Sequence, residues 1–169
     1  GPFPIGFDFD FFGNTYNEFF VSSNGLVLFG AGSNAFSNSS IPDGARPDNY
    51  IAPFWDDLNP EIGGAIHYLH DEGMNRFIVQ YSNMDRFSTF ARFTFQVILH
   101  RDGRIVCQYR NMFGLLESAT VGIQNGAKNV GLLAAANRTY VRDGLALEFF
   151  PVPDWLVPTQ GSGSLAPGE

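Results

Sequence analysis

The sequence is short of cysteine, of basic residues and of long apolar runs. Its one cysteine, Cys107, excludes a disulfide within the chain and lies in an apolar stretch, which predicts a buried structural thiol rather than a nucleophile. Ten Lys and Arg against 17 Asp and Glu give a net charge of −7, which argues against nucleic acid as a partner because phosphate binding needs clustered positive charge. No run approaches the roughly 18 apolar residues of a membrane span.

Charge of either sign is scarce, but apolar residues are not. Charged residues make up 16% of the chain, below the roughly 25% of an average soluble domain, so Asn, Ser, Thr, Gly and Gln must cover much of the surface. The apolar fraction of 44%, with 18 Phe, is enough for the core of one domain. The chain has no nucleophile-elbow, zinc-protease or phosphate-loop motif, and we therefore predict that it is not an enzyme.

Short segments rich in Phe, Val, Ile and Tyr alternate with turn residues along the chain, which is typical of β-strands. We expect a two-residue type I′ hairpin at Asp102-Gly103 and another at Asn24-Gly25, with further turns at Asn125-Gly126 and Asp143-Gly144. These signals predict an all-β fold, an antiparallel β-sandwich over residues 1–150. The expected strands are 5–11, 18–22, 25–30, 50–55, 64–70, 75–82, 90–100, 104–110, 118–124, 129–134 and 144–150.

Several segments, taken in order, resemble the nidogen-type (NIDO) extracellular domain. They are 11–16 (FFGNTY), 20–29 (FVSSNGLVLF), 50–57 (YIAPFWDD), 64–68 (GAIHY), 77–81 (FIVQY), 93–99 (FTFQVIL) and 119–124 (ATVGIQ). The resemblance implies a secreted or cell-surface location, contexts of adhesion and matrix, and no catalytic activity. Animal members of the family carry disulfides, so their absence here points to a bacterial relative, a large multidomain protein.

The tail at 151–169 differs from the rest in composition. It contains four prolines and three glycines, which is typical of a linker. Its spacing of Trp, Pro and Gly also resembles the opening of a bacterial Ig-like repeat, which implies neighbouring Ig-like domains in the parent chain.

Asp56 and Asp57 directly follow an apolar run and are the first candidates for a metal site. With Asn59 they could supply oxygen ligands to Ca²⁺, and Asp48 and Asn49, which precede the same run, are expected nearby. In the nidogen-type pattern, Asp57 matches the first of two acids, Asp56 stands where Ala is common, and Asn59 replaces the second acid. The alternative is structural: one Asp caps a turn or pairs with an arginine such as Arg46.

The leading hypothesis is a non-catalytic interaction or adhesion module that binds an extracellular protein. Its contact surface would be a rim formed by loops 31–49 and 56–63, including Asp48, Asn49, Tyr50 and Trp55, although 31–49 could equally be a solvated crossover between two sheets. A second hypothesis is a calcium-assisted carbohydrate-binding module, and a third is a spacer that orients Ig-like neighbours. Carbohydrate binding would need an exposed row of rings, for which the candidates are Tyr16, Tyr50, Trp55, Tyr68 and Tyr81.

Overall fold

Twelve β-strands and one short 3₁₀ helix make up the part of the chain that this computed structural model describes, residues 1–151. The predicted linker and Ig-like opening therefore lie outside the described residues apart from Pro151, and the predicted domain limit at residue 150 stays a prediction. No helix among the described residues is long and apolar enough to cross a membrane. The elements are β1 (Phe3–Phe11), β2 (Asn14–Ser22), β3 (Leu26–Leu28), β4 (Tyr50–Trp55), β5 (Leu58–Asn59), β6 (Ala65–Asp71), η1 (Glu72–Met74), β7 (Arg76–Arg86), β8 (Arg92–His100), β9 (Ile105–Phe113), β10 (Thr120–Gln124), β11 (Gly131–Ala136) and β12 (Ala146–Phe149).

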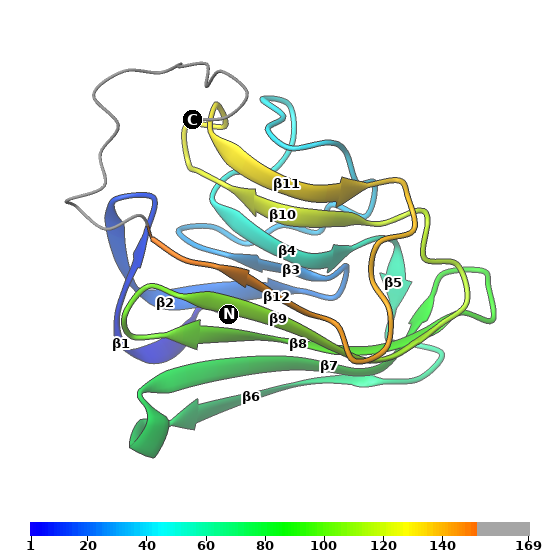
Figure 1. The fold of residues 1–169 in the computed structure, drawn as a ribbon, viewed down its shortest axis with the longest axis horizontal. Coiled ribbons are helices and arrows are strands. Elements are labelled where there is room, and N and C mark those ends of the chain that lie inside the picture. Colours follow the sequence, from blue (N-terminus) through cyan, green and yellow to red (C-terminus); the bar gives the residue numbers. More distant parts are fainter. Residues whose placement is uncertain (152–169) are drawn as a thin grey trace, which may run out of the picture.

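The strands form two antiparallel sheets that pack face to face, so the predicted antiparallel β-sandwich is confirmed (Figure 1). The first sheet has the order β1-β2-β3-β4-β10-β11, and the second has the order β12-β9-β8-β7-β5 with β6 also paired to β7. Buried and exposed side chains alternate along β1, so that Ile5, Phe7, Phe9 and Phe11 point into the core. This is the period-two pattern of a half-buried strand. Cys107 is fully buried in the core between the sheets, as predicted, and burial raises the pKa of its thiol to about 12.

Both predicted hairpins form, but the predicted type I′ turns are wrong. A type I′ turn needs positive φ at both central residues, whereas here Gly25 (φ 76°) and Gly103 (φ 86°) are left-handed and Asn24 and Asp102 are not. Each hairpin instead has a three-residue loop, 23–25 or 101–103, that ends in a left-handed glycine. The short strand β5 was also not expected, because two residues carry no periodicity.

Two buried tyrosines connect the sheets through hydrogen bonds across the core. The Tyr109 hydroxyl donates to the carbonyl oxygen of Pro53 at 2.6 Å, and the Tyr81 hydroxyl lies 3.0 Å from the carbonyl oxygens of Ser22 and Leu26. Pro53 stands in an inner strand because the pairing of β4 with β10 is irregular at this point, where a proline with no N–H can be accommodated. Tyr109 therefore satisfies a carbonyl group at an irregular position in the sheet.

The segment 31–49 forms a third layer on the outer face of the first sheet. Ile41 packs there with Leu28, Tyr50, Ala52 and Trp55 in a second apolar cluster, separate from the core between the sheets. All six residues of β4 are consequently buried, because one face of the strand meets the second sheet and the other meets this segment. The segment is thus a structural layer over the sheet and not a solvated crossover.

Polar side chains of the sheet hold the 31–49 segment in place through its backbone. The indole nitrogen of Trp55 donates to the Ala35 carbonyl at 2.9 Å. The side-chain oxygen of Gln124 accepts from the Asp43 amide at 2.7 Å, while its nitrogen donates to the Pro47 carbonyl at 3.0 Å. The segment has no strand or helix of its own, so no regular backbone pairing satisfies its N–H and C=O groups. These side-chain hydrogen bonds satisfy several of them and thereby fix the course of the segment.

Replacing Gly25 with alanine should destabilise the fold severely. Gly25 is left-handed, and a Cβ atom there would overlap the carbonyl oxygen of Phe54 in β4, so the hairpin and β4 would have to separate. We expect Gly25→Ala to lower the free energy of unfolding by roughly 3 kcal/mol or more in urea denaturation. Gly13→Ala is the matched control, because Gly13 has the same backbone conformation (φ 77°) with open space around it and should cost only about 1–2 kcal/mol. Equal losses for the two variants would show that close packing on β4 is unimportant.

Candidate functional site

Four loops meet at the end of the sandwich where β4, β7, β9 and β11 finish. They are the middle of the 31–49 segment, the 56–64 connection around β5, the β7–β8 loop and the β9–β10 loop (Figure 1). They meet there because antiparallel neighbours alternate in direction, so the ends of β4, β7 and β9 lie next to the starts of β8 and β10. The two loops predicted to form a rim are among these four.

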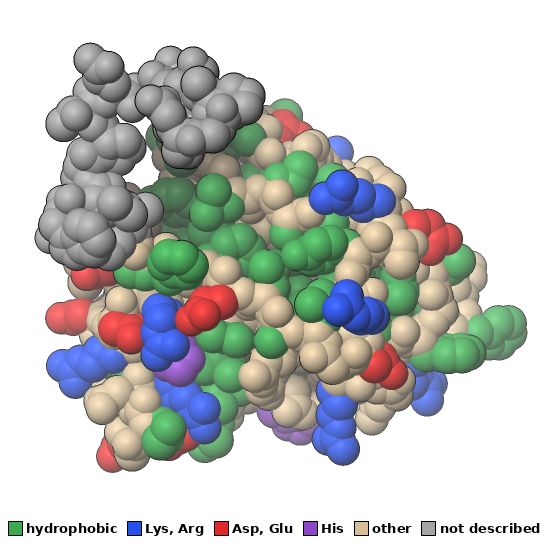
Figure 2. Space-filling model, in the orientation of Figure 1, with side chains coloured by type: hydrophobic (Ala, Val, Ile, Leu, Met, Phe, Trp, Pro, Cys, Tyr) green, Lys and Arg blue, Asp and Glu red, His purple; other side chains and the backbone are tan. Residues whose placement is uncertain are grey.

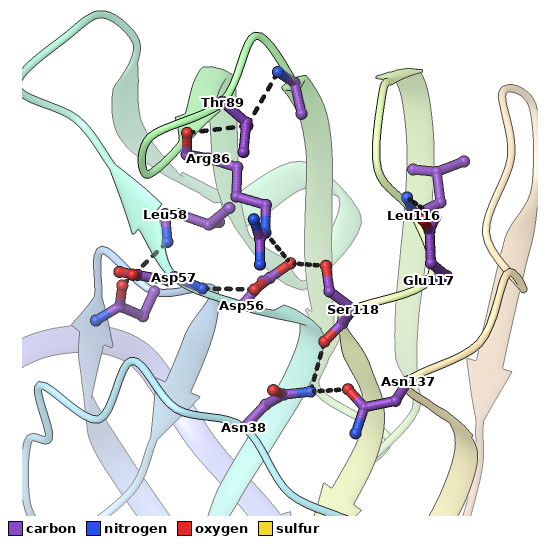
Figure 3. A network of polar contacts seen from close by, with 12 residues as sticks. Asn38, Asp56, Asp57, Leu58, Arg86, Thr89, Leu116, Glu117, Ser118 and Asn137 are labelled. Atoms are coloured by element: carbon purple, nitrogen blue, oxygen red, sulfur yellow. Dashed lines mark hydrogen bonds and ion pairs between the residues drawn. The ribbon is translucent and has the colours of Figure 1, made fainter.

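Asp56 lies at the centre of this end and is almost completely buried. Its Oδ2 accepts from Arg86 Nε at 2.9 Å and from Ser118 Oγ at 2.5 Å, and its Oδ1 accepts from the Asp57 amide at 2.8 Å (Figure 3). One carboxylate thus joins the end of β4 to the end of β7 and to the β9–β10 loop. A buried carboxylate with a charged partner and further hydrogen bonds to both oxygens is a well-satisfied structural group.

Asn38 extends this network to the 31–49 segment. Its side-chain nitrogen donates to the Ser118 carbonyl at 2.8 Å and to Asn137 Oδ1 at 3.1 Å (Figure 3). The same nitrogen lies 2.9 Å from Thr120 Oγ1. Thr120 Oγ1 in turn donates to the Ser39 carbonyl at 2.7 Å. The segment is therefore fixed to both the β9–β10 loop and the turn after β11.

The β7–β8 loop is held by its own turn and by the β5 connection. The Phe87 amide donates to the Asp57 carbonyl at 2.8 Å, and the Arg86 amide donates to the Ala91 carbonyl at 3.1 Å. Within the loop, Thr89 Oγ1 donates to the Arg86 carbonyl at 3.2 Å. These bonds close the loop on itself, so residues at its tip are presented from an ordered base.

Large apolar side chains are exposed on all four loops. Phe90 is 98% exposed, and the other five are between 44% and 65% exposed. Figure 2 shows hydrophobic side chains projecting at the right-hand end of the molecule, where the loops that join β5 to β6, β7 to β8 and β9 to β10 lie in Figure 1. We call this set the apolar end, and its members are Phe36, Ile62, Phe87, Phe90, Phe113 and Leu115.

Most of the residues predicted to form the rim are not available to a partner. Tyr50 and Trp55 are fully buried beneath the 31–49 segment, so their prediction as contact residues is wrong. Asn49 is buried and donates through its side-chain nitrogen to Tyr16 and to the Phe29 carbonyl. Asp48 is partly exposed but stands at the opposite end of β4 from Asp56, so the expected proximity of the two is wrong, because six extended residues span roughly 20 Å.

Two of the three residues predicted to bind calcium, Asp56 and Asn59, have side-chain hydrogen bonds within the protein. Asp56 Oδ2 accepts from Arg86 and Ser118, and Asn59 Oδ1 accepts from the Glu61 amide at 2.9 Å. The described residues contain no group of three or more His, Cys, Asp or Glu placed to hold a metal ion. Calcium binding by Asp56, Asp57 and Asn59 stays a prediction, and thermal unfolding with Ca²⁺ or with EDTA would test it, because an ion that binds only the folded state raises the Tm.

The aromatic residues considered for stacking on sugars do not form an exposed row. Tyr50, Trp55 and Tyr81 are fully buried and Tyr16 is partly buried, which leaves only Tyr68 more than half exposed. Phe87, Phe90 and Phe113 are not among the contact residues predicted from the sequence; Phe90 falls in the expected strand 90–100, whereas β8 begins at Arg92. The available signal was the position of Phe87 and Phe90 beside Ser and Thr in a stretch with no apolar alternation.

Asp56→Asn should weaken the base of the apolar end. The variant keeps the shape of the side chain but removes the negative charge that faces Arg86, and we expect a loss of about 2–3 kcal/mol in the free energy of unfolding, measured in urea. Glu148→Gln is the matched control: its ion pair with Arg104 is exposed on both sides, so the loss should stay below about 0.5 kcal/mol. A loss as small for Asp56→Asn as for the control would mean that the network contributes little to stability.

Comparison with known proteins places the chain in a family. A sequence profile of the family described as "NIDO related" matches residues 1–144. Matching relatives include "Dendrite extension defective protein 1" of Caenorhabditis elegans, 34% identical over 58 residues, and "Alpha-tectorin" of Mus musculus, 40% identical over 60 residues. Each match covers 34% of this chain but only 5% and 3% of the respective relatives, so the chain spans a small part of their length.

No solved structure matches the chain. Both relatives come from animals, so the predicted bacterial source stays a prediction. The family match fits an extracellular domain and confirms the resemblance to the nidogen-type domain. With 144 of its 169 residues covered by the family profile, the chain belongs to the NIDO-related family.

Proposed function

We propose that this chain is a non-catalytic extracellular interaction module that binds a protein partner through its apolar end. The observation that carries the proposal is the gathering of six exposed large apolar side chains at one end of the sandwich, five on four loops and one at the end of β9. Single exposed apolar residues are ordinary, but a contiguous group is characteristic of a contact surface. Neither relative is named for a catalytic activity, which agrees with a binding role.

The composition of the apolar end fits a protein partner. Four of its six members are Phe, and aromatic side chains are enriched at the centres of protein interfaces. The half-exposed Arg92, paired with Asp85, lies at the start of β8 next to these loops and can contribute to the polar border that such interfaces have. Phe113 and Arg92 are paired across β9 and β8, so an aromatic ring and a charged group stand side by side.

The order of the loops supports the same proposal. The hydrogen bonds of Asp56, Asn38 and Thr89 fix the backbone beneath the exposed rings in the unbound chain. A surface that is already ordered loses less conformational entropy on binding, so more of the contact energy contributes to affinity. Structural support at a distance from the contact residues is thus part of the proposed function.

Phe90→Ser should reduce partner binding by about tenfold or more, because a fully exposed aromatic side chain at the centre of an interface is the usual energetic anchor. Binding would be measured by biolayer interferometry against a panel of purified extracellular matrix proteins. Met74→Ser is the matched control, since Met74 is 62% exposed in η1, at the opposite end of β7. Neither substitution should change the free energy of unfolding by more than about 0.5 kcal/mol.

Two results would contradict the proposal. One is a partner whose binding Met74→Ser weakens as much as Phe90→Ser does. The other is no binding to any protein of the panel, which would favour the spacer role. The neighbouring Ig-like domains that such a spacer would orient remain a prediction.

A further inference from the structure

The outer face of the second sheet carries two β-bulges that stand opposite the same residue. In β7, both Ser82 and Asn83 fall between the pairs Tyr81–Phe95 and Met84–Phe93, so two residues oppose Thr94 of β8. In β9, Arg110 is the extra residue between the pairs Phe95–Tyr109 and Thr94–Asn111. A bulge turns an additional side chain to one face, and bulges are over-represented beside functional sites.

The two bulges surround a hollow on this face. It has a volume of about 300 Å³ and is lined by Gln80, Ser82, Asn83, Thr94, Arg110 and Asn111. Asn83 adopts a left-handed backbone (φ 51°), with its amide donating to Thr94 Oγ1 at 3.0 Å. A non-glycine residue in this conformation costs free energy, and such costs concentrate at binding and catalytic sites.

A row of amide side chains extends the hollow across the sheet. Gln80, Gln96 and Gln108 occupy paired positions on β7, β8 and β9, all on the outer face, and Gln96 Nε2 donates to Gln108 Oε1 at 2.7 Å. An adjoining hollow of about 410 Å³ contains all three, and the two hollows share Gln80, Thr94 and Arg110. Figure 2 looks onto the side of the molecule where β8, β9 and β12 lie in front, and tan, which marks the backbone and the side chains that are neither hydrophobic nor charged nor His, covers much of it.

The charge of this surface is unusual for the chain. The net charge is −7, yet neither hollow has an Asp or Glu in its lining. Among the described residues, the Arg110 guanidinium makes no hydrogen bond or ion pair, whereas Arg76, Arg86, Arg92 and Arg104 are each paired with a carboxylate. Asp143, on the adjoining turn, directs its Oδ1 to the Met112 amide at 2.7 Å. The hollow thus offers a free cation among groups that donate and accept hydrogen bonds.

We infer that this surface binds an acidic saccharide. A carboxylate or sulfate group of the sugar accepts from Arg110, whose planar fork matches such anions, and the sugar hydroxyls exchange hydrogen bonds with Gln80, Gln96 and Thr94. A protein partner fits less well, because the bulge hollow has no large apolar residue to act as an anchor. An added β-strand is also excluded, since β8 is an inner strand whose backbone is already paired on both sides.

This inference concerns a different surface from the apolar end and does not depend on the proposed function. The inferred binding can be tested by titration calorimetry on the whole chain. The ligand is a heparin-derived hexasaccharide, which carries carboxylate and sulfate groups. We expect Arg110→Gln to weaken binding by about tenfold or more, the loss typical of one charge-assisted hydrogen bond. Arg101→Gln, which removes the same charge from the exposed β8–β9 turn, should leave the affinity unchanged.

A second variant and two further probes separate this site from general attraction between charges. The double variant Gln96→Met, Gln108→Met keeps the charge and approximate size but removes the amides, and it should also weaken binding several-fold. A neutral hexasaccharide of N-acetylglucosamine and free sulfate should each bind far more weakly than the acidic saccharide. The inference is overturned if the acidic saccharide does not bind, if Arg101→Gln weakens binding as much as Arg110→Gln, or if the double variant binds like the unmodified chain. It is equally overturned if the neutral sugar or free sulfate binds as tightly.

Discussion

Burial of β4 on both faces is the constraint on which the rest of the structure depends. The strand lies in the first sheet with one face against the second sheet and the other beneath the 31–49 segment, so all six of its residues are buried. A strand that is apolar on both faces needs a packing layer on each face. Here one layer is the second sheet and the other is an irregular segment rather than a sheet or helix. Trp55 and Gln124 hold that segment by its backbone groups, because it has no strand pairing of its own.

The same constraint determines what happens at the end of the strand. Asp56 follows directly after β4 and is therefore buried, and a buried carboxylate needs a charged partner and hydrogen bonds. Arg86 and Ser118 supply them, and in doing so they fix the ends of two other connections. The acidic pair that suggests a metal site in the sequence is thus the base of an ordered group of loops, with the exposed rings of Phe87 and Phe90 above it.

The two candidate surfaces differ in chemistry, and this difference follows from where each lies. Five of the six residues of the apolar end lie in loops, where no strand alternation constrains them, and the sixth, Phe113, ends β9, so large apolar side chains can be exposed without loss of core packing. The bulge hollow lies on the outer face of a sheet whose inner face holds Val79, Phe95 and Cys107, so its own side chains are the polar half of the alternation. One domain of the NIDO-related family can thereby present an apolar and a polar contact surface that are independent of each other.

The sequence by itself determined the all-β class, the approximate strands and the burial of Cys107, because strand alternation and turn residues are local signals. It also carried the family resemblance, which rests on the order of short segments. Only the tertiary structure decided the role of Asp56, the burial of Tyr50 and the distance between Asp48 and Asp56, since each depends on which elements pack together. The same holds for the bulges around Thr94: an extra residue in a strand can be recognised only from the register of its partner, which no single segment encodes.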